Sequence, residues 1–179
     1  FGLLRIVNNI DDVTLKGVEF AANAAVSENV SVYGGFNIID SEIKANAVRP
    51  DTVGNKSPYT PDYTINAGIQ AQTDLTDGIQ LVGRMDYNKV GPTWFHTVQD
   101  QDQSSLFAQA NYGLTQRNAY DVVNLRVGLQ SDYWSITGFA KNLFDNDYLE
   151  EVIPSPQFGG SFIHPAAKVR YGVEVVYRF

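Results

Sequence analysis

The last twelve residues of the chain, Lys168 to Phe179, alternate between two kinds of side chain. The apolar and aromatic positions are Val169, Tyr171, Val173, Val175, Tyr177 and Phe179. The positions between them are polar or glycine, with Val176 as the one exception. A repeat of two residues is the pattern of a β-strand with one dry face and one wet face. This stretch therefore predicts a β-strand.

The order of side chains along the dry face indicates which medium that face meets. Tyr171 at one end and the pair Tyr177 and Phe179 at the other enclose Val173 and Val175. The stretch is as long as a tilted membrane-crossing strand, which needs about 9–11 residues. Two aromatic girdles with an aliphatic band between them are typical of strands in outer-membrane barrels. The pattern predicts a transmembrane strand, and a strand of a soluble all-β sheet is the alternative.

The same alternation occurs in six further stretches, which predicts seven strands in all. The six stretches are 13–26, 30–38, 61–73, 79–88, 120–130 and 134–141. Short polar turns such as Asp77-Gly78 alternate along the chain with long segments at about 41–58, 91–117 and 142–165. Outer-membrane barrels have this asymmetry, with the long loops outside the cell. Lys16 is out of phase with Glu19, which predicts either a bulge near Gly17 or a strand that is already above the membrane there.

The sequence thus predicts an all-β fold, an antiparallel transmembrane β-barrel segment. The wet faces carry Asn, Gln, Thr and Gly more often than Lys and Glu. This composition suits a wet lumen packed against another polar body. Single-chain bacterial barrels normally have an even number of strands, and seven strands enclose very little. The chain starts without Met or a signal-peptide pattern, so we expect further strands to precede Phe1.

Composition disfavours several other classes of protein. The formal net charge of −7 over 179 residues argues against an electrostatic nucleic-acid binder, because such domains are usually basic. The chain has no Cys, so it has neither a disulfide framework nor thiolate chemistry. It also lacks the run of about 18 apolar residues that a helical membrane span requires.

A motif near the end of the chain carries a family resemblance. After the amphipathic stretch that begins at Trp134, the chain reads Asn-Leu-Phe-Asp-x-x-Tyr, formed by Asn142, Leu143, Phe144, Asp145 and Tyr148. Followed by a variable loop and a glycine-containing strand that ends Tyr-Arg-Phe, this resembles the C-terminus of TonB-dependent receptors, the plugged 22-stranded transporters of the bacterial outer membrane. Gly17-Val18-Glu19 and Thr60-Pro61-x-Tyr63-x-Ile65-Asn66 are further matches.

The resemblance covers nearly the whole chain and implies a role for it. Residues 1–179 would be the C-terminal portion of the barrel wall, about seven of 22 strands, with the plug and earlier strands upstream. The implied function is uptake of a scarce ligand such as a ferric siderophore, energised by the TonB complex through the N-terminal part. Tyr177 and Phe179 would be the signal read by the barrel-assembly machinery, and lipid would surround the wall. A passive outer-membrane pore or small structural β-barrel is the alternative, distinguished by the absence of an upstream plug domain.

The long segments hold the candidate binding residues. Trp94 and Phe95 are suited to stacking on a ligand ring or to an interface belt, and with His96 they are the predicted ligand contacts. Both histidines, His96 and His164, lie in long segments. His96, with Asp100 and Asp102 nearby, is a candidate for a metal or ferric-ligand site, and a solvated polar loop is the alternative.

Two other constellations lack the spacing that their chemistry needs. Asp145, Asn146 and Asp147 offer oxygen ligands without the spacing of a calcium loop. Ser104 and Ser105 supply nucleophiles for His96 without a recognised arrangement. We therefore predict no bound metal, no cofactor and no enzymatic activity.

Overall fold

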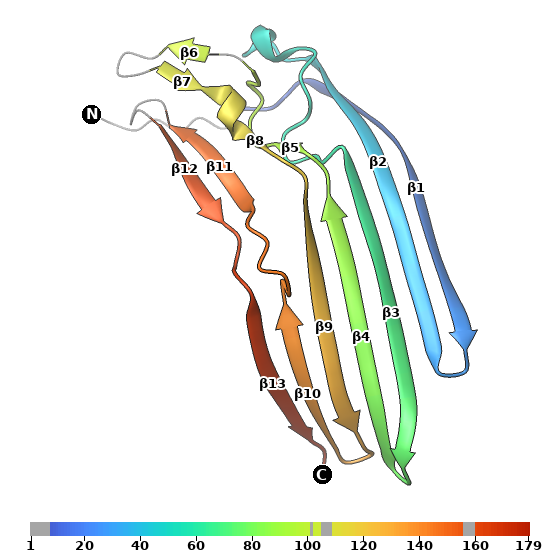
Figure 1. Ribbon diagram of the computed structural model, residues 1–179. Coiled ribbons are helices and arrows are strands. Elements are labelled where there is room, and N and C mark those ends of the chain that lie inside the picture. The colour runs from blue at the N-terminus through green and yellow to red at the C-terminus, as the bar shows by residue number, and fades with distance from the viewer. Residues whose placement is uncertain (1–7, 101, 105–108, 156–159) are drawn as a thin grey trace.

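The computed structural model describes residues 8–100, 102–104, 109–155 and 160–179. Seven long strands form one antiparallel sheet that curves as a wall (Figure 1). These strands are β1 (Asp12–Ser27), β2 (Val30–Ala45), β3 (Tyr63–Thr76), β4 (Ile79–Val90), β9 (Tyr120–Gln130), β10 (Trp134–Lys141) and β13 (Arg170–Tyr177). They lie side by side in the order of the sequence, so the seven predicted strands and the antiparallel all-β fold are confirmed.

The register places the predicted apolar positions on one side of the sheet. Phe36 lies opposite Phe20 on β1 and opposite Ile65 on β3. Met85 likewise lies between Ile69 and Leu125. Residues directly opposite each other in an antiparallel pair point to the same face. The alternation of every strand therefore adds up to one apolar face and one polar face.

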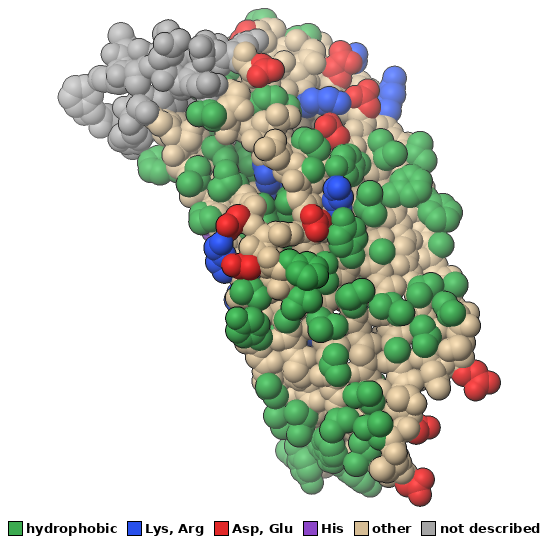
Figure 2. Space-filling model, in the orientation of Figure 1, with side chains coloured by type: hydrophobic (Ala, Val, Ile, Leu, Met, Phe, Trp, Pro, Cys, Tyr) green, Lys and Arg blue, Asp and Glu red, His purple; other side chains and the backbone are tan. Residues whose placement is uncertain are grey.

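The apolar face is uncovered. Val18 on β1 and Val173 on β13 are 65% and 69% exposed, although both belong to the apolar face. In Figure 2 the middle and lower part of this view carries hydrophobic side chains, while charged side chains lie in the upper part and at the lower tips. Apolar patches of this extent mark a surface that meets a partner or a membrane.

Charged side chains mark the upper limit of the apolar face. Lys16, Asp40, Lys89 and Asp121 fall on its alternation and lie about ten to twelve residues from the nearest short turn. Lys56 Nζ lies 2.8 Å from Asp40 Oδ1, and this ion pair lowers the pKa of Asp40 and raises the pKa of Lys56. Tilted strands of this length between the turns and the charges match the thickness of a bilayer core.

The structure corrects the bulge predicted near Gly17. β1 and β2 pair without interruption from Val13 to Ala25, and the register shifts lie at the two ends of β1. Lys16 points to the same side as Val18 and lies opposite Asp40. The break in alternation therefore reflects the strand leaving the apolar band, the other reading that the sequence allowed.

The long segments contain structure that the sequence analysis did not predict. Three small two-stranded sheets join β5 (Thr93–Trp94) to β8 (Gln116–Arg117), β6 (Asp102–Ser104) to β7 (Gln109–Asn111), and β11 (Leu149–Ser155) to β12 (Gly160–Pro165). Short 3₁₀ helices form at Pro50–Thr52 and Tyr112–Thr115. Most of the buried apolar residues, among them Ile43, Val98 and Val152, belong to these upper regions. The small sheets and 3₁₀ helices together form a loop layer at one end of the long strands. The packed interior thus lies in this loop layer rather than under the sheet.

The short turns lie at the opposite end of the sheet from the loop layer (Figure 1). Asp77 and Gly78 form a two-residue turn between β3 and β4, and Gly78 has φ +77°, which suits a residue without Cβ. The described part of the chain contains no helix with the length and apolar character needed to cross a membrane.

Candidate ligand-binding surface

The polar face of the sheet carries a hydrogen-bonded cluster across β2, β3 and β4. The Tyr33 hydroxyl donates to Asp86 Oδ1, and Arg84 Nη2 donates to the Tyr33 hydroxyl at 2.9 Å. Arg84 Nε also donates to Asp86 Oδ2 at 3.0 Å. The ring of Tyr33 crosses the backbone of Gly68, the residue directly opposite it on β3. This cluster fixes a tyrosine and an arginine on the polar face of the sheet.

The second half of the polar face is richer in cations. Arg126 lies opposite Phe139, with its guanidinium carbon 5.9 Å from the ring centre. Lys141 Nζ lies 5.9 Å from the same ring. Arg126 also lies 3.8 Å from Glu174. Arg126, Phe139 and Lys141, together with Asp86 and Asn124, line a recess of about 320 Å³ on the wall.

The segment that holds the predicted ligand contacts is built on the β5–β8 pair. Trp94 lies opposite Gln116, and its carbonyl accepts a hydrogen bond from Tyr59 N–H at 2.7 Å. Phe95 is 5% exposed and packs edge-on against the ring of Tyr59, with ring centres 5.5 Å apart. Trp94 keeps part of its surface accessible, whereas Phe95 belongs to the interior of the loop layer.

His96 is half-buried beside Tyr112, with 4.9 Å between the ring centres. Its Nδ1 accepts a hydrogen bond from Val98 N–H at 3.0 Å. Burial lowers the pKa of His96, and the positive charge of Arg49 lowers it further. The imidazole is therefore neutral at neutral pH, with Nδ1 already occupied by a backbone donor.

Arg117 on β8 joins several parts of the loop layer. Its guanidinium carbon lies 4.6 Å from the centre of the Tyr120 ring and 5.4 Å from that of Phe95. The two terminal nitrogens donate to Thr93 Oγ1 at 2.9 Å and to the Leu149 carbonyl at 3.1 Å. In the described part of the chain, the buried Nε has no hydrogen-bond partner. This cation therefore holds β5, β8 and β11 together.

The Asn-Leu-Phe-Asp motif ends β10 and ties it to both neighbouring strands. Asn142 is buried with φ +50°, and Asp145 has φ +53°. Asn142 Nδ2 donates to the carbonyls of Asn146 at 3.0 Å and Ala167 at 3.3 Å, and Asn142 Oδ1 accepts from Asn146 N–H at 3.0 Å. Asp145 Oδ1 accepts from Val169 N–H at 2.8 Å. Asn and Asp tolerate the left-handed conformation better than most residues, which explains why they occupy these positions.

The rest of the motif has mixed roles. The amide N–H of Leu143 donates to the Val123 carbonyl on β9 at 2.8 Å, while Phe144 is 67% exposed. The ring of Tyr148 stacks on that of Tyr120 with centres 3.7 Å apart. Most of this motif thus forms a structural corner at the top of β9, β10 and β13.

The other candidate residues are scattered. Asp100 is exposed, whereas the side chains of Asp102 and Ser104 and all of Ser105 lie outside the described residues. Within the described ranges, no three His, Cys, Asp or Glu side chains gather as a metal site would require. His164 Nδ1 lies 3.6 Å from Glu150. Asp147 contacts Lys168, and this contact raises the pKa of Lys168.

The last residues lie at the end of the sheet that carries the short turns. Tyr177 is directly opposite Trp134, and Arg178 N–H donates to the Tyr133 carbonyl at 2.7 Å. Tyr177 and Phe179 are both exposed. Several aromatic side chains thus lie at this rim, the end at which the sequence analysis placed Tyr177 and Phe179 in one of the two aromatic girdles.

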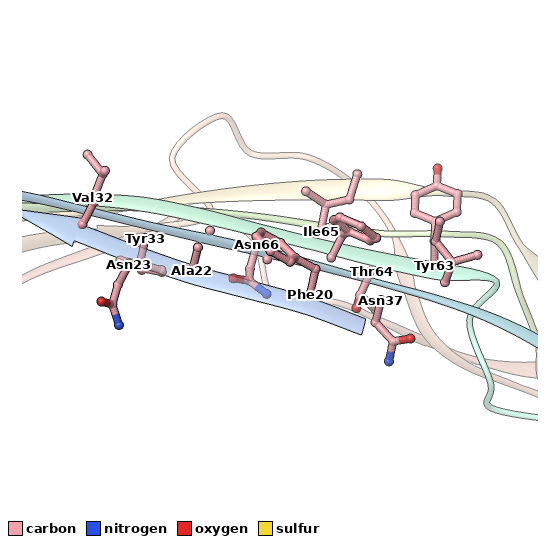
Figure 3. A pocket seen from close by; sticks show the side chains of 15 residues that line it. Phe20, Ala22, Asn23, Val32, Tyr33, Asn37, Tyr63, Thr64, Ile65 and Asn66 are labelled. Carbon is pink, nitrogen blue, oxygen red and sulfur yellow. The ribbon is translucent and has the colours of Figure 1, made fainter. Parts of the chain in front are cut away.

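A wide hollow lies on the apolar face of β1, β2 and β3. It measures about 940 Å³ and lies around the stacked rings of Phe20 and Phe36. Figure 3 shows Val32, Ile65 and Tyr63 on one side of the sheet, while Asn23, Asn37 and Asn66 are on the other. The hollow belongs to the surface that the wall presents to its apolar surroundings, so it is not a candidate for a polar ligand.

A curved antiparallel wall with one exposed apolar face, one polar face and a folded loop layer at one end defines the class of outer-membrane β-barrels. The sequence model of the family described as "TonB dependent receptor-like, beta-barrel" matches residues 2–171. The chain belongs to this family, whose barrels lie in the bacterial outer membrane and whose members are transporters rather than enzymes.

Solved receptors have the same fold. The ferric yersiniabactin uptake receptor FyuA from Yersinia pestis superposes with a TM-score of 0.74 at 20% identity, over 91% of this chain and 23% of the receptor. BauA, the ferric preacinetobactin receptor from Acinetobacter baumannii, gives a TM-score of 0.67 at 14% identity, over 91% and 22%. The ferric-catecholate import receptor Fiu from E. coli K12 gives 0.58 at 19% identity, over 91% and 20%. The chain thus spans between a fifth and a quarter of the length of these receptors.

Proposed function

We propose that the chain is the wall and part of the extracellular surface of an outer-membrane receptor that takes up a scarce ligand such as a ferric siderophore. The observation that carries this proposal is the two-faced sheet with a packed loop layer at one end only. A wall of this kind separates lipid from a polar lumen, and ordered loops above it offer a surface for binding. Membership of the TonB-dependent receptor family supports the same function.

The ligand would bind in the loop layer and at the top of the polar face. Trp94 and His96 keep accessible surface, and Phe95 supports them from below by packing against Tyr59. Aromatic rings suit the flat, conjugated groups that many iron chelators carry. The ring of Trp94 would stack on the ligand, and the neutral His96 would offer a ring edge or a hydrogen bond.

The rest of the transport machinery would come from the whole receptor. The proposal places residues 1–179 at the C-terminal portion of a larger barrel in the bacterial outer membrane, with a plug domain in its lumen. TonB would deliver energy through the N-terminal part of that receptor. Tyr177 and Phe179, exposed at the rim with the short turns, would be read by the barrel-assembly machinery.

Uptake of radioactive iron by the source bacterium tests the proposal. Cells that lack the full-length gene should lose uptake of at least one ferric siderophore under iron limitation, and the gene on a plasmid should restore it. A Trp94→Ala receptor should reach the membrane in normal amounts but bind that siderophore more weakly, as measured by intrinsic fluorescence.

A passive pore would give a different result. The purified full-length protein would then conduct ions steadily in a planar bilayer, and its deletion would reduce diffusion of many small solutes equally. That pair of results would overturn the receptor function.

A further inference from the structure

A second recess lies on the polar face, nearer to the short turns than the cluster around Tyr33. It measures about 250 Å³ and is lined by residues of β3, β4, β9 and β10. Val82 and Gly128 lie directly opposite each other within it, and they are short beside the longer side chains around them. Gly128 stands two residues before Gln130, where β9 ends. We call this space the lower recess, because it lies at the end of the sheet away from the loop layer.

Two arginines line the lower recess on the side of the loop layer. Arg84 lies directly opposite Arg126, and like charges in such positions are destabilising. Asp86 offsets the charge of Arg84, which donates to both of its carboxylate oxygens. Arg126 has only Glu174, at 3.8 Å, and both of these side chains are more than half exposed, so this ion pair contributes little. The charge of Arg126 is therefore only weakly compensated.

The other sides of the lower recess offer hydrogen-bonding groups without negative charge. Gln70 and Gln72 line it from β3, Gln130 from β9 and Thr137 from β10. Among the residues that the structure describes, these four side chains form no hydrogen bond with another residue, and no Asp or Glu lines the recess. Amide and hydroxyl groups can all donate to an oxygen anion. Free neutral donors beside a weakly compensated guanidinium therefore favour an anionic group.

We propose that the lower recess binds a carboxylate of the ligand on its way to the periplasm, which makes the ligand a negatively charged iron chelate with free carboxylates. The inference rests on the proposed function, since it assumes a receptor that moves a chelate through its lumen. A guanidinium pairs with the two oxygens of a carboxylate through parallel hydrogen bonds, and such charge-assisted bonds are stronger than neutral ones. A cationic group would be repelled, and an uncharged one would leave Arg126 without a better counter-charge.

The size and position of the lower recess give it a role distinct from that of the loop layer. At about 250 Å³ it is smaller than the usual pocket for a drug-sized molecule, so it would hold one arm of the chelate rather than the whole of it. Trp94 and His96 lie at the opposite end of the strands, where the ligand would be captured first. The lower recess would therefore act after capture, on the periplasmic side of the path.

Chemical modification of the wild-type, full-length receptor in detergent tests the lower recess, with citrate as the probe. Phenylglyoxal reacts with free guanidinium groups, and mass spectrometry of the digested protein measures the rate at each arginine. Millimolar citrate should slow the reaction at Arg126 several-fold relative to sodium chloride of the same ionic strength. Arg178 is the internal control, because it lies at the same end of the sheet but does not line the lower recess. Its rate should be the same in both salts.

Three results would overturn the carboxylate site. Equal rates at Arg126 in the two salts would mean that the recess does not bind carboxylates. Equal slowing at Arg126 and Arg178 would mean that citrate only screens charge. Arg126 that does not react even in sodium chloride would mean that a resident part of the receptor already fills the recess.

Substitutions in the full-length receptor add a measurement of transport. Arg126→Gln should lower the rate of uptake of the siderophore identified by gene deletion several-fold, while its affinity at the cell surface stays the same. Arg126→Lys keeps the charge and should be intermediate, and Arg170→Gln changes a polar-face arginine outside the recess and should transport normally. Outer-membrane amounts of each variant correct the rates. Loss of surface affinity in Arg126→Gln, or normal uptake by it, would also overturn the site.

The two proposals fail separately. A passive pore would conduct ions steadily and still show protection of Arg126 by citrate. A receptor that takes up only uncharged chelates would pass the uptake test and show no protection.

Discussion

The phenol ring of Tyr33 on β2 lies across the backbone of Gly68 on β3, in the space that a Cβ at residue 68 would occupy. By crossing β3 in this way, the ring reaches Asp86 on β4 with its hydroxyl. One glycine therefore allows three strands to be joined by a single side chain on the polar face.

The change Gly68→Ala should destabilise the receptor by about 1–3 kcal/mol, the usual cost of overpacking. The new methyl group would displace the ring of Tyr33 and weaken its hydrogen bond to Asp86. Urea unfolding of the full-length protein in detergent measures the effect. Gly83→Ala is the matched control, since its nearest contact would be the Arg126 carbonyl at 4.0 Å. Equal stability of the two variants would show that the ring moves aside at no cost.

Asn142 combines a left-handed backbone with a buried, hydrogen-bonded side chain. Asn142→Gly keeps the backbone conformation and loses the side-chain bonds to Asn146 and Ala167, at a cost of roughly 1–3 kcal/mol. Asn142→Ala should lose about 1 kcal/mol more, because alanine is strained at positive φ. The unfolding midpoints of the two variants separate the loss of the side-chain hydrogen bonds from the cost of backbone strain. If alanine were the more stable of the two, the corner would not depend on the left-handed conformation.

His96 should make the loop layer sensitive to acid. Its pKa is lowered in the folded protein, so the stabilisation associated with the neutral ring is present above its unfolded pKa of about 6.5 and is lost as pH falls through the folded pKa. Protonation would add charge to a half-buried site near Arg49 and remove the acceptor for Val98 N–H. The amide of Val98 should therefore exchange faster at about pH 5 than at about pH 7.5, after correction for the intrinsic rate.

A His96→Gln variant is the control for this pH dependence, because glutamine does not titrate. Its Val98 amide should show the same protection at both pH values. Acid-induced loss of protection that persists in the Gln variant would assign the effect to another group.

Leu125 and Arg126 should meet different media although they are adjacent. Leu125 shares the apolar face with Met85, whereas Arg126 shares the polar face with Phe139. Spin labels at the two positions should differ in accessibility to oxygen, with the higher value at residue 125. Leu125→Arg should cost about 2–4 kcal/mol if the residue lies near the bilayer midplane. Equal accessibility at both positions would contradict the orientation of the whole sheet.

Phe179 should matter for assembly more than for the finished barrel. It is fully exposed beyond the end of β13, so its loss should cost less than the roughly 3–5 kcal/mol typical of a core Phe. Deleting it from the full-length protein should lower the amount in the outer membrane several-fold, while ligand affinity per inserted molecule stays the same. Normal yield with impaired binding would place this rim at the ligand side instead.

The sequence alone determined the seven long strands and the side of the sheet to which the residues of these strands point. Alternation with a period of two is a local property, set by the pleat of the backbone, and a membrane strand needs it over its whole crossing. The family motif at Asn142 to Tyr148 could also be recognised from residue order, and its left-handed residues and the Asn142–Asn146 hydrogen bonds are local. Its contacts with Val123, Ala167 and Val169 depend on the fold.

The tertiary structure alone decided which residues of different strands meet. The opposition of Lys141 to Arg170, the passage of Tyr33 over Gly68 and the burial of Phe95 against Tyr59 each depend on register or on loop packing. The small sheets of the loop layer were missed for related reasons. β5, β6, β7 and β8 have two or three residues each and are too short to show a period, and the longer β11 and β12 carry no regular alternation. Pairing between distant segments is set by the whole packed assembly, and a single sequence carries no local signal for it.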